Sequence, residues 1–193
     1  MFLTFINQSN TMRIHLKLFV LILLLPLSVT AQNGKSFPFI EGETLKDKKV
    51  ALPKDTKGKY TLVGIAYSKK SDDLLKGWYS PMYRTFIDPP EVAFIPTDDY
   101  DVNMYFVALL KGIYKVADNK ITSKMKAGID PKFHKNMVIY HGKIKEYKKE
   151  LNLGQKDLPY FFVLNENGKI VYHTEGAYSD RKLYEIQSAI ETE

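Results

Sequence analysis

Apolar residues follow a strand-like spacing in several parts of this chain. Nearly continuous apolar runs at 60–68 and 104–112 predict strands covered on both faces, because a strand with one wet face would alternate apolar and polar residues. Two further runs, joined by an Asn-Glu-Asn-Gly turn, predict a β-hairpin over 158–176. A turn around 45–49 within an extended lead, and a short strand at 137–140, complete the expected sheet.

Between the strands, apolar residues recur every three or four positions, which predicts four amphipathic helices. The first runs from Ser71, and Pro81 is expected to bend or end it because proline lacks the N–H that a helix interior needs. The second stops at the Gly-Ile-Asp-Pro segment 128–131, and the last is capped by Ser179 or Asp180. The four apolar stripes consist of Leu74, Leu75, Trp78 and Met82; Ile113, Val116, Ala117, Ile121 and Met125; Ile144, Tyr147 and Leu151; and Leu183, Ile186 and Ile190.

This order of elements predicts an α/β fold with a mixed central sheet. Strands separated by helices run parallel through right-handed crossovers, whereas the hairpin adds an antiparallel edge. Helices should cover both faces of the sheet, and the chain should finish with the hairpin and one helix. Residues 32–193 are enough for one domain with a sizeable core and too few for two ordinary domains.

Residues 1–31 are expected to be a signal peptide. A basic segment at 12–17 precedes an apolar run of 12 residues at 18–29, and small residues stand before Gln32. The run is short for a membrane span, so we expect cleavage, export to the periplasm or the medium, and no stable membrane insertion afterwards. A retained anchor is the alternative, and Met12 is an alternative start.

Composition removes several classes of chemistry. The chain has no cysteine, which excludes disulfides, thiol catalysis, thiolate metal sites and lipid attachment through cysteine. Its net charge is +6, but the lysines are scattered beside glutamates, so solvated helix faces are expected and nucleic-acid binding is not. His134, His141 and His173 lack metal-ligand spacing, and no phosphate loop, dinucleotide fingerprint or nucleophile elbow occurs. We therefore expect neither a metal nor a cofactor.

From 37 to 190 the chain resembles the thioredoxin-like superfamily, especially its exported thiol reductases and peroxiredoxins. The resemblance rests on the lead "FPFIEGETLKDKKVALPKDTKGKYTLV", on the strand-to-helix junction at Ser68, and on the proline, strand, Asn-Gly turn, strand and glycine within 158–176. It implies the thioredoxin-like form of the mixed sheet. Two segments, "SDDLLKGWYSPMYRTF" and "EGAYSDRKLYEIQSAI", are distantly similar to the mitochondrial ATP synthase assembly factors, which assist assembly rather than thiol exchange.

Ser68 and Ser71 match the positions of the family's Cys-x-x-Cys pair. A hydroxyl cannot form a disulfide, and it holds its proton about as tightly as water does, far more tightly than a free thiol with its pKa of about 8.5. No thiol–disulfide oxidoreductase activity is therefore expected. One interpretation makes the serines a helix cap worth about 1 kcal/mol; the other makes one of them a nucleophile with Lys69 or Lys70 as its base.

Pro159 matches the proline that the superfamily holds in cis beside its cysteines. The resemblance therefore implies a cis Leu158–Pro159 bond and a peptide-binding groove between this proline and Ser68. An ordinary proline that opens a strand is the alternative. We expect the groove to be formed by Leu158, Pro159 and Tyr160 and to be lined by Tyr67, Lys69 and Lys70.

The resemblance without its cysteines predicts a redox-inactive binding, assembly or chaperone-like module with a protein or peptide partner. Two alternatives belong to other classes: a divergent enzyme that uses Ser68 or Ser71 as nucleophile, and a protein that binds a small ligand. The sequence favours the binding module over the enzyme. Two adjacent lysines at an exposed helix start are expected to stay charged, and a charged lysine cannot act as the base that a serine nucleophile needs.

Overall fold

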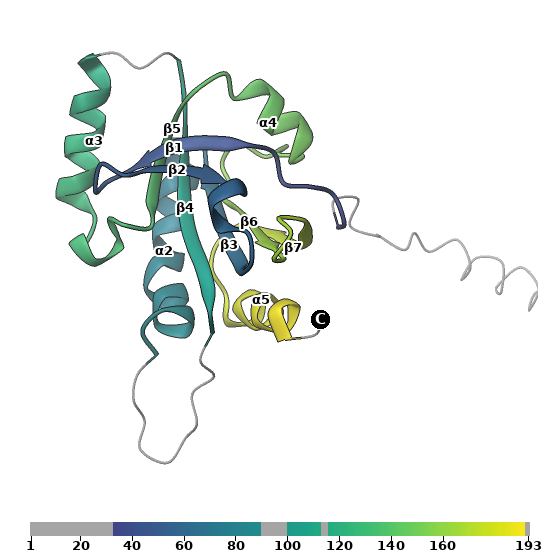
Figure 1. Ribbon diagram of the computed structural model, residues 1–193. Coiled ribbons are helices and arrows are strands. Elements are labelled where there is room, and N and C mark those ends of the chain that lie inside the picture. Colours follow the sequence, from purple (N-terminus) through teal and green to yellow (C-terminus); the bar gives the residue numbers. More distant parts are fainter. Residues whose placement is uncertain (1–32, 90–99, 113–115, 192–193) are drawn as a thin grey trace, which may run out of the picture. The chain divides into compact units, whose positions relative to one another are not determined.

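A computed structural model describes residues 33–89, 100–112 and 116–191 (Figure 1), so the predicted signal peptide lies outside the described residues. Within these ranges, seven strands form one sheet in the order β2-β1-β5-β4-β3-β6-β7. The strands are β1 (Ile40–Thr44), β2 (Lys49–Leu52), β3 (Tyr60–Ala66), β4 (Val102–Lys111), β5 (Met137–Gly142), β6 (Tyr160–Leu164) and β7 (Ile170–Glu175).

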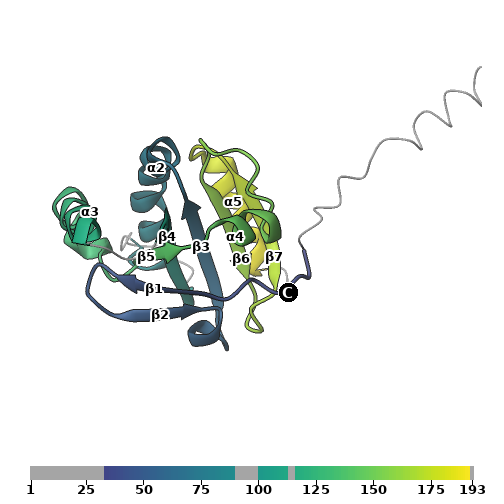
Figure 2. The same ribbon diagram turned by 90° about the horizontal axis from the view of Figure 1, so that it is seen from above.

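The sheet is mixed, as predicted. β3 is parallel to β4, and β4 to β5, whereas β6 is antiparallel to both β3 and β7. The predicted turn near 45–49 joins the antiparallel pair β1 and β2, and Figure 2 shows this pair at one end of the sheet with β6 and β7 at the other. Every residue of β3 except Tyr60 is buried, which explains the unbroken apolar run in the sequence.

Helices cover both faces of the sheet. Trp78 of α2 and Ile186 of α5 share one core cluster with Phe161, whereas Leu151, which follows α4, shares the opposite cluster with Phe162. Adjacent residues of β6 thus face different layers. No helix in the described ranges is long and apolar enough to cross a membrane. The helices are α2 (Lys69–Phe86), α3 (Val116–Gly128), α4 (Lys145–Glu150) and α5 (Asp180–Glu191), with short 3₁₀ turns η1 (Lys54–Thr56) and η2 (Pro131–Phe133).

The helix α2 differs from its prediction at Pro81. It begins at Lys69 and passes through Pro81 to end at Phe86, so the expectation that the proline could end it is wrong. An interior proline costs about 3 kcal/mol or more. Burial of Met82 and Phe86, at 1% and 3% exposure, offsets this cost because each side chain contributes about 1.5–3 kcal/mol.

Gly64 allows the sheet and α2 to pack closely. A Cβ at this position would lie 2.8 Å from Cε1 of Phe161, 3.0 Å from Cδ1 of Phe106 and 3.2 Å from Cδ1 of Leu75. The glycine therefore accommodates two aromatic rings beneath the start of α2. This packing fixes the end of β3, where the chain turns into the helix.

Candidate functional site: a serine-capped helix start

Ser68 and Ser71 close the start of α2 with a reciprocal pair of hydrogen bonds. Ser68 is the N-cap residue, and its Oγ accepts from the Ser71 N–H at 3.1 Å. Ser71 returns the interaction, since its Oγ accepts from the Ser68 N–H at 3.0 Å. The two Oγ atoms are 3.1 Å apart. This arrangement is a capping box, in which a serine takes the place of the usual Glu or Gln. The predicted capping role is confirmed.

The Ser71 hydroxyl has no capacity left for chemistry. It is fully buried, accepts from the Tyr67 and Ser68 N–H groups at 3.2 and 3.0 Å, and donates to the Ser68 carbonyl oxygen at 3.0 Å. One hydrogen and two lone pairs are all that a hydroxyl has. A nucleophile needs a base at its proton, and here a backbone carbonyl takes that position.

Pro159 lies beside this junction. The antiparallel register pairs Ile65 with Tyr160, so the preceding Pro159 lies level with Ala66 at the end of β3. Its carbonyl accepts from the Gly176 N–H at 2.8 Å, which ties the start of β6 to the end of β7. The predicted neighbourhood of Ser68 and Pro159 follows from this register.

The predicted cis bond at Leu158–Pro159 is wrong. Among the described residues the cis peptide bond is Leu52–Pro53, at the end of β2. Pro159 instead opens β6, which was the alternative. Because cis and trans X–Pro bonds differ by only about 0.5–1 kcal/mol, local context decides between them and a sequence match does not. Here the loop before Pro159 is held by a Leu158 N–H bond to the Gln155 carbonyl oxygen at 3.3 Å.

Tyr67 and Tyr160, both predicted to line the groove, contact each other. Their rings stack with centroids 6.4 Å apart. The Tyr67 hydroxyl donates to the Leu153 carbonyl oxygen at 2.8 Å, and Lys148 Nζ lies 5.1 Å from the Tyr67 ring centroid. Burial raises the pKa of Tyr67 and raises that of Tyr160 to about 12, so both hydroxyls stay protonated at neutral pH. Tyr67 is partly exposed, whereas Tyr160 is buried at 3% exposure and lines a separate cavity of about 310 Å³ with Leu151 and His173.

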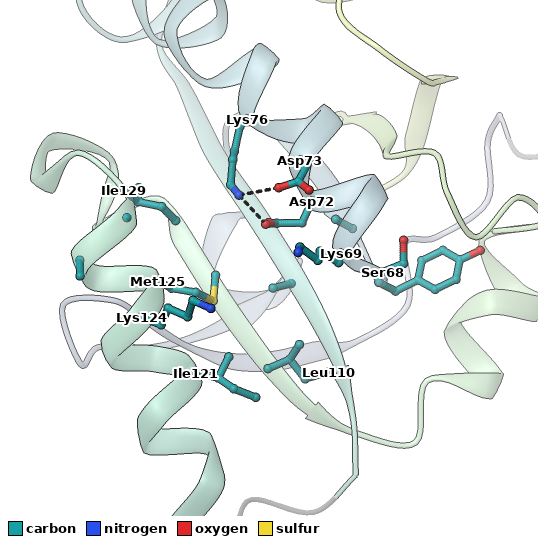
Figure 3. A pocket seen from close by; sticks show the side chains of 15 residues that line it. Ser68, Lys69, Asp72, Asp73, Lys76, Leu110, Ile121, Lys124, Met125 and Ile129 are labelled. Atoms are coloured by element: carbon teal, nitrogen blue, oxygen red, sulfur yellow. Dashed lines mark hydrogen bonds and ion pairs between the residues drawn. The ribbon is translucent and has the colours of Figure 1, made fainter.

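Lys69 and Lys70 point to different sides of the junction. Lys70 Nζ lies 3.5 Å from Asp157 Oδ2, on the side of Pro159, and both side chains are more than half exposed. Lys69 instead lines a cavity of about 700 Å³ between α2 and α3, together with Ser68 (Figure 3). The sequence predicted a groove between Ser68 and Pro159, whereas this cavity lies between α2 and α3, and Tyr67, predicted to line the groove, lines the cavity as well.

The cavity was missed because residues distant in sequence form it. Ala66 and Ala108 are paired on the parallel strands β3 and β4, whereas Ile121 and Met125 come from α3. In the sequence, the apolar stripe of α3 was the one sign of this cavity. Ile121 belongs to that stripe and yet is 40% exposed in the structure. An apolar stripe predicts a face that packs against something, but it does not say how completely the face is covered.

The described residues contain no group of three His, Asp or Glu side chains that could hold a metal ion. His134 is buried, with Nε2 2.8 Å from the Ile129 carbonyl oxygen. His173 stacks on Phe162 in the sheet, and burial lowers its pKa. His134 and His173 thus have structural surroundings, and His134 is a core residue.

Comparison with known proteins agrees with this scaffold. The exposed lipoprotein thioredoxin Etrx1 of Streptococcus pneumoniae is 16% identical with a TM-score of 0.52, over 80% of this chain and 99% of that one. An uncharacterized conserved protein of Geobacillus kaustophilus is 12% identical with a TM-score of 0.52, over 82% of each chain. At these identities the likeness shows the fold alone, which is thioredoxin-like. No curated protein sequence matches the chain.

The family model for the ATP10 protein matches residues 27–191, a range that includes every residue that the structure describes. The predicted similarity to ATP synthase assembly factors and the predicted thioredoxin-like fold without the Cys-x-x-Cys pair are confirmed. This chain belongs to the ATP10 protein family.

Proposed function

We propose that this protein is an assembly module that binds a protein partner without thiol chemistry. The observation that carries the proposal is the reciprocal bonding of Ser68 and Ser71, which commits both side chains to the start of α2. The chain has no cysteine elsewhere that could take over a redox role. Membership of a family of assembly factors supports a role in which recognition is retained and electron transfer is not.

The exposed side of the junction supplies a surface for a partner. Lys70 and Asp157 form an ion pair across α2 and the loop before β6. An exposed pair of this kind contributes at most about 1 kcal/mol, so either member can exchange its partner for a charge on a bound protein. Tyr67, which is partly exposed and stacks on the buried Tyr160, adds ordered aromatic area beside the pair, and tyrosine is enriched at protein interfaces. The family description makes ATP synthase subunits the first partner class to test.

Site-specific photo-crosslinking tests this surface. A benzophenone amino acid replaces exposed Lys156, next to Asp157, in the full chain produced in its host. The matched control places the same group at Tyr184, which is 69% exposed on α5. The proposal predicts adducts to one or a few proteins from position 156 and none of these from position 184. The same adducts from both positions, or none from position 156, would contradict it.

The nucleophile alternative has its own test. A fluorophosphonate probe labels activated serines, and the saturated Ser71 hydroxyl and the capping Ser68 hydroxyl should stay unlabelled. Labelling that disappears in a Ser68→Ala or Ser71→Ala variant would favour the enzyme.

Export is part of the proposal. It is supported by the basic segment and the apolar run of residues 1–31, as the sequence predicts. N-terminal sequencing of the protein from its host should give Gln32 as the first residue, in the periplasm or the medium. A cell-associated protein that retains Met1 or Met12 would contradict export by this route.

A further inference from the structure

The cavity between α2 and α3 has an apolar body. Side chains at the ends of β3 and β4 form its floor, and α3 forms a wall (Figure 3). Its volume of about 700 Å³ falls within the range of about 300–1,000 Å³ that is usual for small-molecule sites. Such sites are mostly apolar, with a few polar groups at defined positions. The aliphatic lining residues are Ala66, Ala108, Leu110, Ile121, Met125, Ala127 and Ile129.

The charged side chains that line the cavity carry a net positive charge, and we call these side chains its rim. Lys76 Nζ bridges Asp72 and Asp73 at 3.1 and 2.9 Å, and its hydrogen bond lowers the pKa of Asp73. That cation is therefore shared between two carboxylates. Lys69 and Lys124 also line the cavity, and neither forms an ion pair with another of the described residues. Three lysines face two aspartates, which leaves one positive charge uncompensated.

The two remaining lysines are placed to share one anion. Figure 3 shows Lys69 on α2 and Lys124 on α3 pointing into the space between the two helices from opposite sides. Lys69 is also the first residue of α2, where the helix dipole is positive. A negative group at the mouth of the cavity would meet both ammonium groups and the helix start.

We propose that this cavity binds an anionic amphiphile with a single apolar chain, such as a long-chain carboxylate. The chain occupies the apolar body, where flexible Met125 adapts to its shape, and the carboxylate lies between Lys69 and Lys124. A cationic amphiphile of equal length meets the same apolar surface but is repelled by the rim. The discriminating feature is therefore the sign of the headgroup charge.

Calorimetric titration of the full chain tests the ligand class. Octanoate, decanoate and laurate, each below its micelle concentration, are compared with dodecyltrimethylammonium. Burial of each added methylene contributes about 0.8 kcal/mol, so affinity should rise about fourfold per methylene until the cavity is full. We expect saturable binding of laurate at one site and at least tenfold weaker binding of the cation. Equal affinity for both headgroups, or no saturable laurate binding, would overturn the proposal.

Three variants locate the site. Lys69→Glu and Lys124→Glu should each weaken laurate binding at least fivefold, because attraction becomes repulsion. Ile121→Ser should weaken it through lost apolar contact, and its exposed position makes unfolding a small risk. Lys120→Glu is the matched control, since Lys120 lies on α3 outside the cavity lining. Circular dichroism checks folding of each variant.

Binding elsewhere on the chain would be unaffected by these substitutions, so unchanged laurate affinity in a folded Lys69→Glu or Lys124→Glu protein would also overturn the proposal. Lys156 is not among the residues that line the cavity, so crosslinking from position 156 tests the proposed function separately from laurate binding.

Discussion

Ser68 and Ser71 exchange hydrogen bonds through both their side chains and their backbone amides, with Ser71 fully buried and Ser68 partly exposed. This relationship makes the pair a structural substitute for two reactive cysteines. It also predicts that the two serines are unequal, because only Ser71 satisfies two backbone amides and one carbonyl.

Ser71→Ala should therefore destabilise the protein more than Ser68→Ala. Loss of the Ser68 cap costs about 1 kcal/mol, and Ser68→Gly costs a few tenths. Ser71→Ala leaves the Tyr67 and Ser68 amides without their acceptor in a part-buried setting, at about 1–3 kcal/mol for a buried group. Urea unfolding measures both variants. An equal or reversed order would show that the hydrogen bonds of Ser71 contribute little.

Restoring sulfur should restore exchange chemistry. In Ser68→Cys/Ser71→Cys the two side chains begin from positions whose oxygens are 3.1 Å apart, and the start of α2 lowers the pKa of the first thiol. The double variant should form a disulfide in oxidised glutathione and accelerate insulin reduction by dithiothreitol. The wild type and the single Ser68→Cys variant are the controls. Two thiols that stay free in oxidised glutathione would contradict the assignment of this junction.

Gly64 in β3 and Gly77 in α2 should respond oppositely to a methyl group. Gly64→Ala overpacks the contact with Phe161 and Phe106 and should cost about 1–3 kcal/mol. Gly77→Ala on the exposed side of α2 meets no atom within 4 Å and should stabilise the helix by up to about 1 kcal/mol. Thermal or urea unfolding measures both. A neutral Gly64→Ala would mean that β3 and α2 pack less tightly than described.

His173 should make stability fall in mild acid. Its pKa is lowered from 6.5 by burial, which outweighs the opposing influence of Glu175, and its Nδ1 has no hydrogen-bond partner among the described residues. The unfolded chain therefore takes up the proton first. The contribution is complete above pH 6.5 and is lost as pH falls from there through the folded pKa. Urea midpoints at pH 7.5 and 5.5 should differ less in His173→Phe than in the wild type. If the two urea midpoints differ as much in His173→Phe as in the wild type, the loss of stability in acid comes from other groups.

The sequence predicted much of the fold because its local signals agree with one another. The apolar run at 60–68, the hairpin turn and the cap at Ser68 each indicate their element independently, and the order of elements then restricts the sheet. Predictions failed where the outcome depended on a small difference in free energy or on packing in the core. The isomer of Leu158–Pro159 depends on about 0.5–1 kcal/mol, and the passage of α2 through Pro81 depends on the burial of Met82 and Phe86 in the core.

The candidate site was predicted in part. Ser68, Pro159, Tyr67 and Tyr160 lie at one junction, because β3 and β6 pair side by side with Ile65 opposite Tyr160. The cavity beside Lys69 was not predicted. The space between α2 and α3 depends on packing between residues that are far apart in the chain.

The central claim is that this protein assists its partner through binding and not through serine chemistry. Cells that lack the chromosomal copy are supplied with the wild type or with Ser68→Ala, and the target complex identified by crosslinking from position 156 is quantified on native gels. The claim predicts that Ser68→Ala restores the assembled complex to near the wild-type amount, since the cap costs only about 1 kcal/mol. Loss of the complex in cells that contain folded Ser68→Ala protein at wild-type abundance would contradict it.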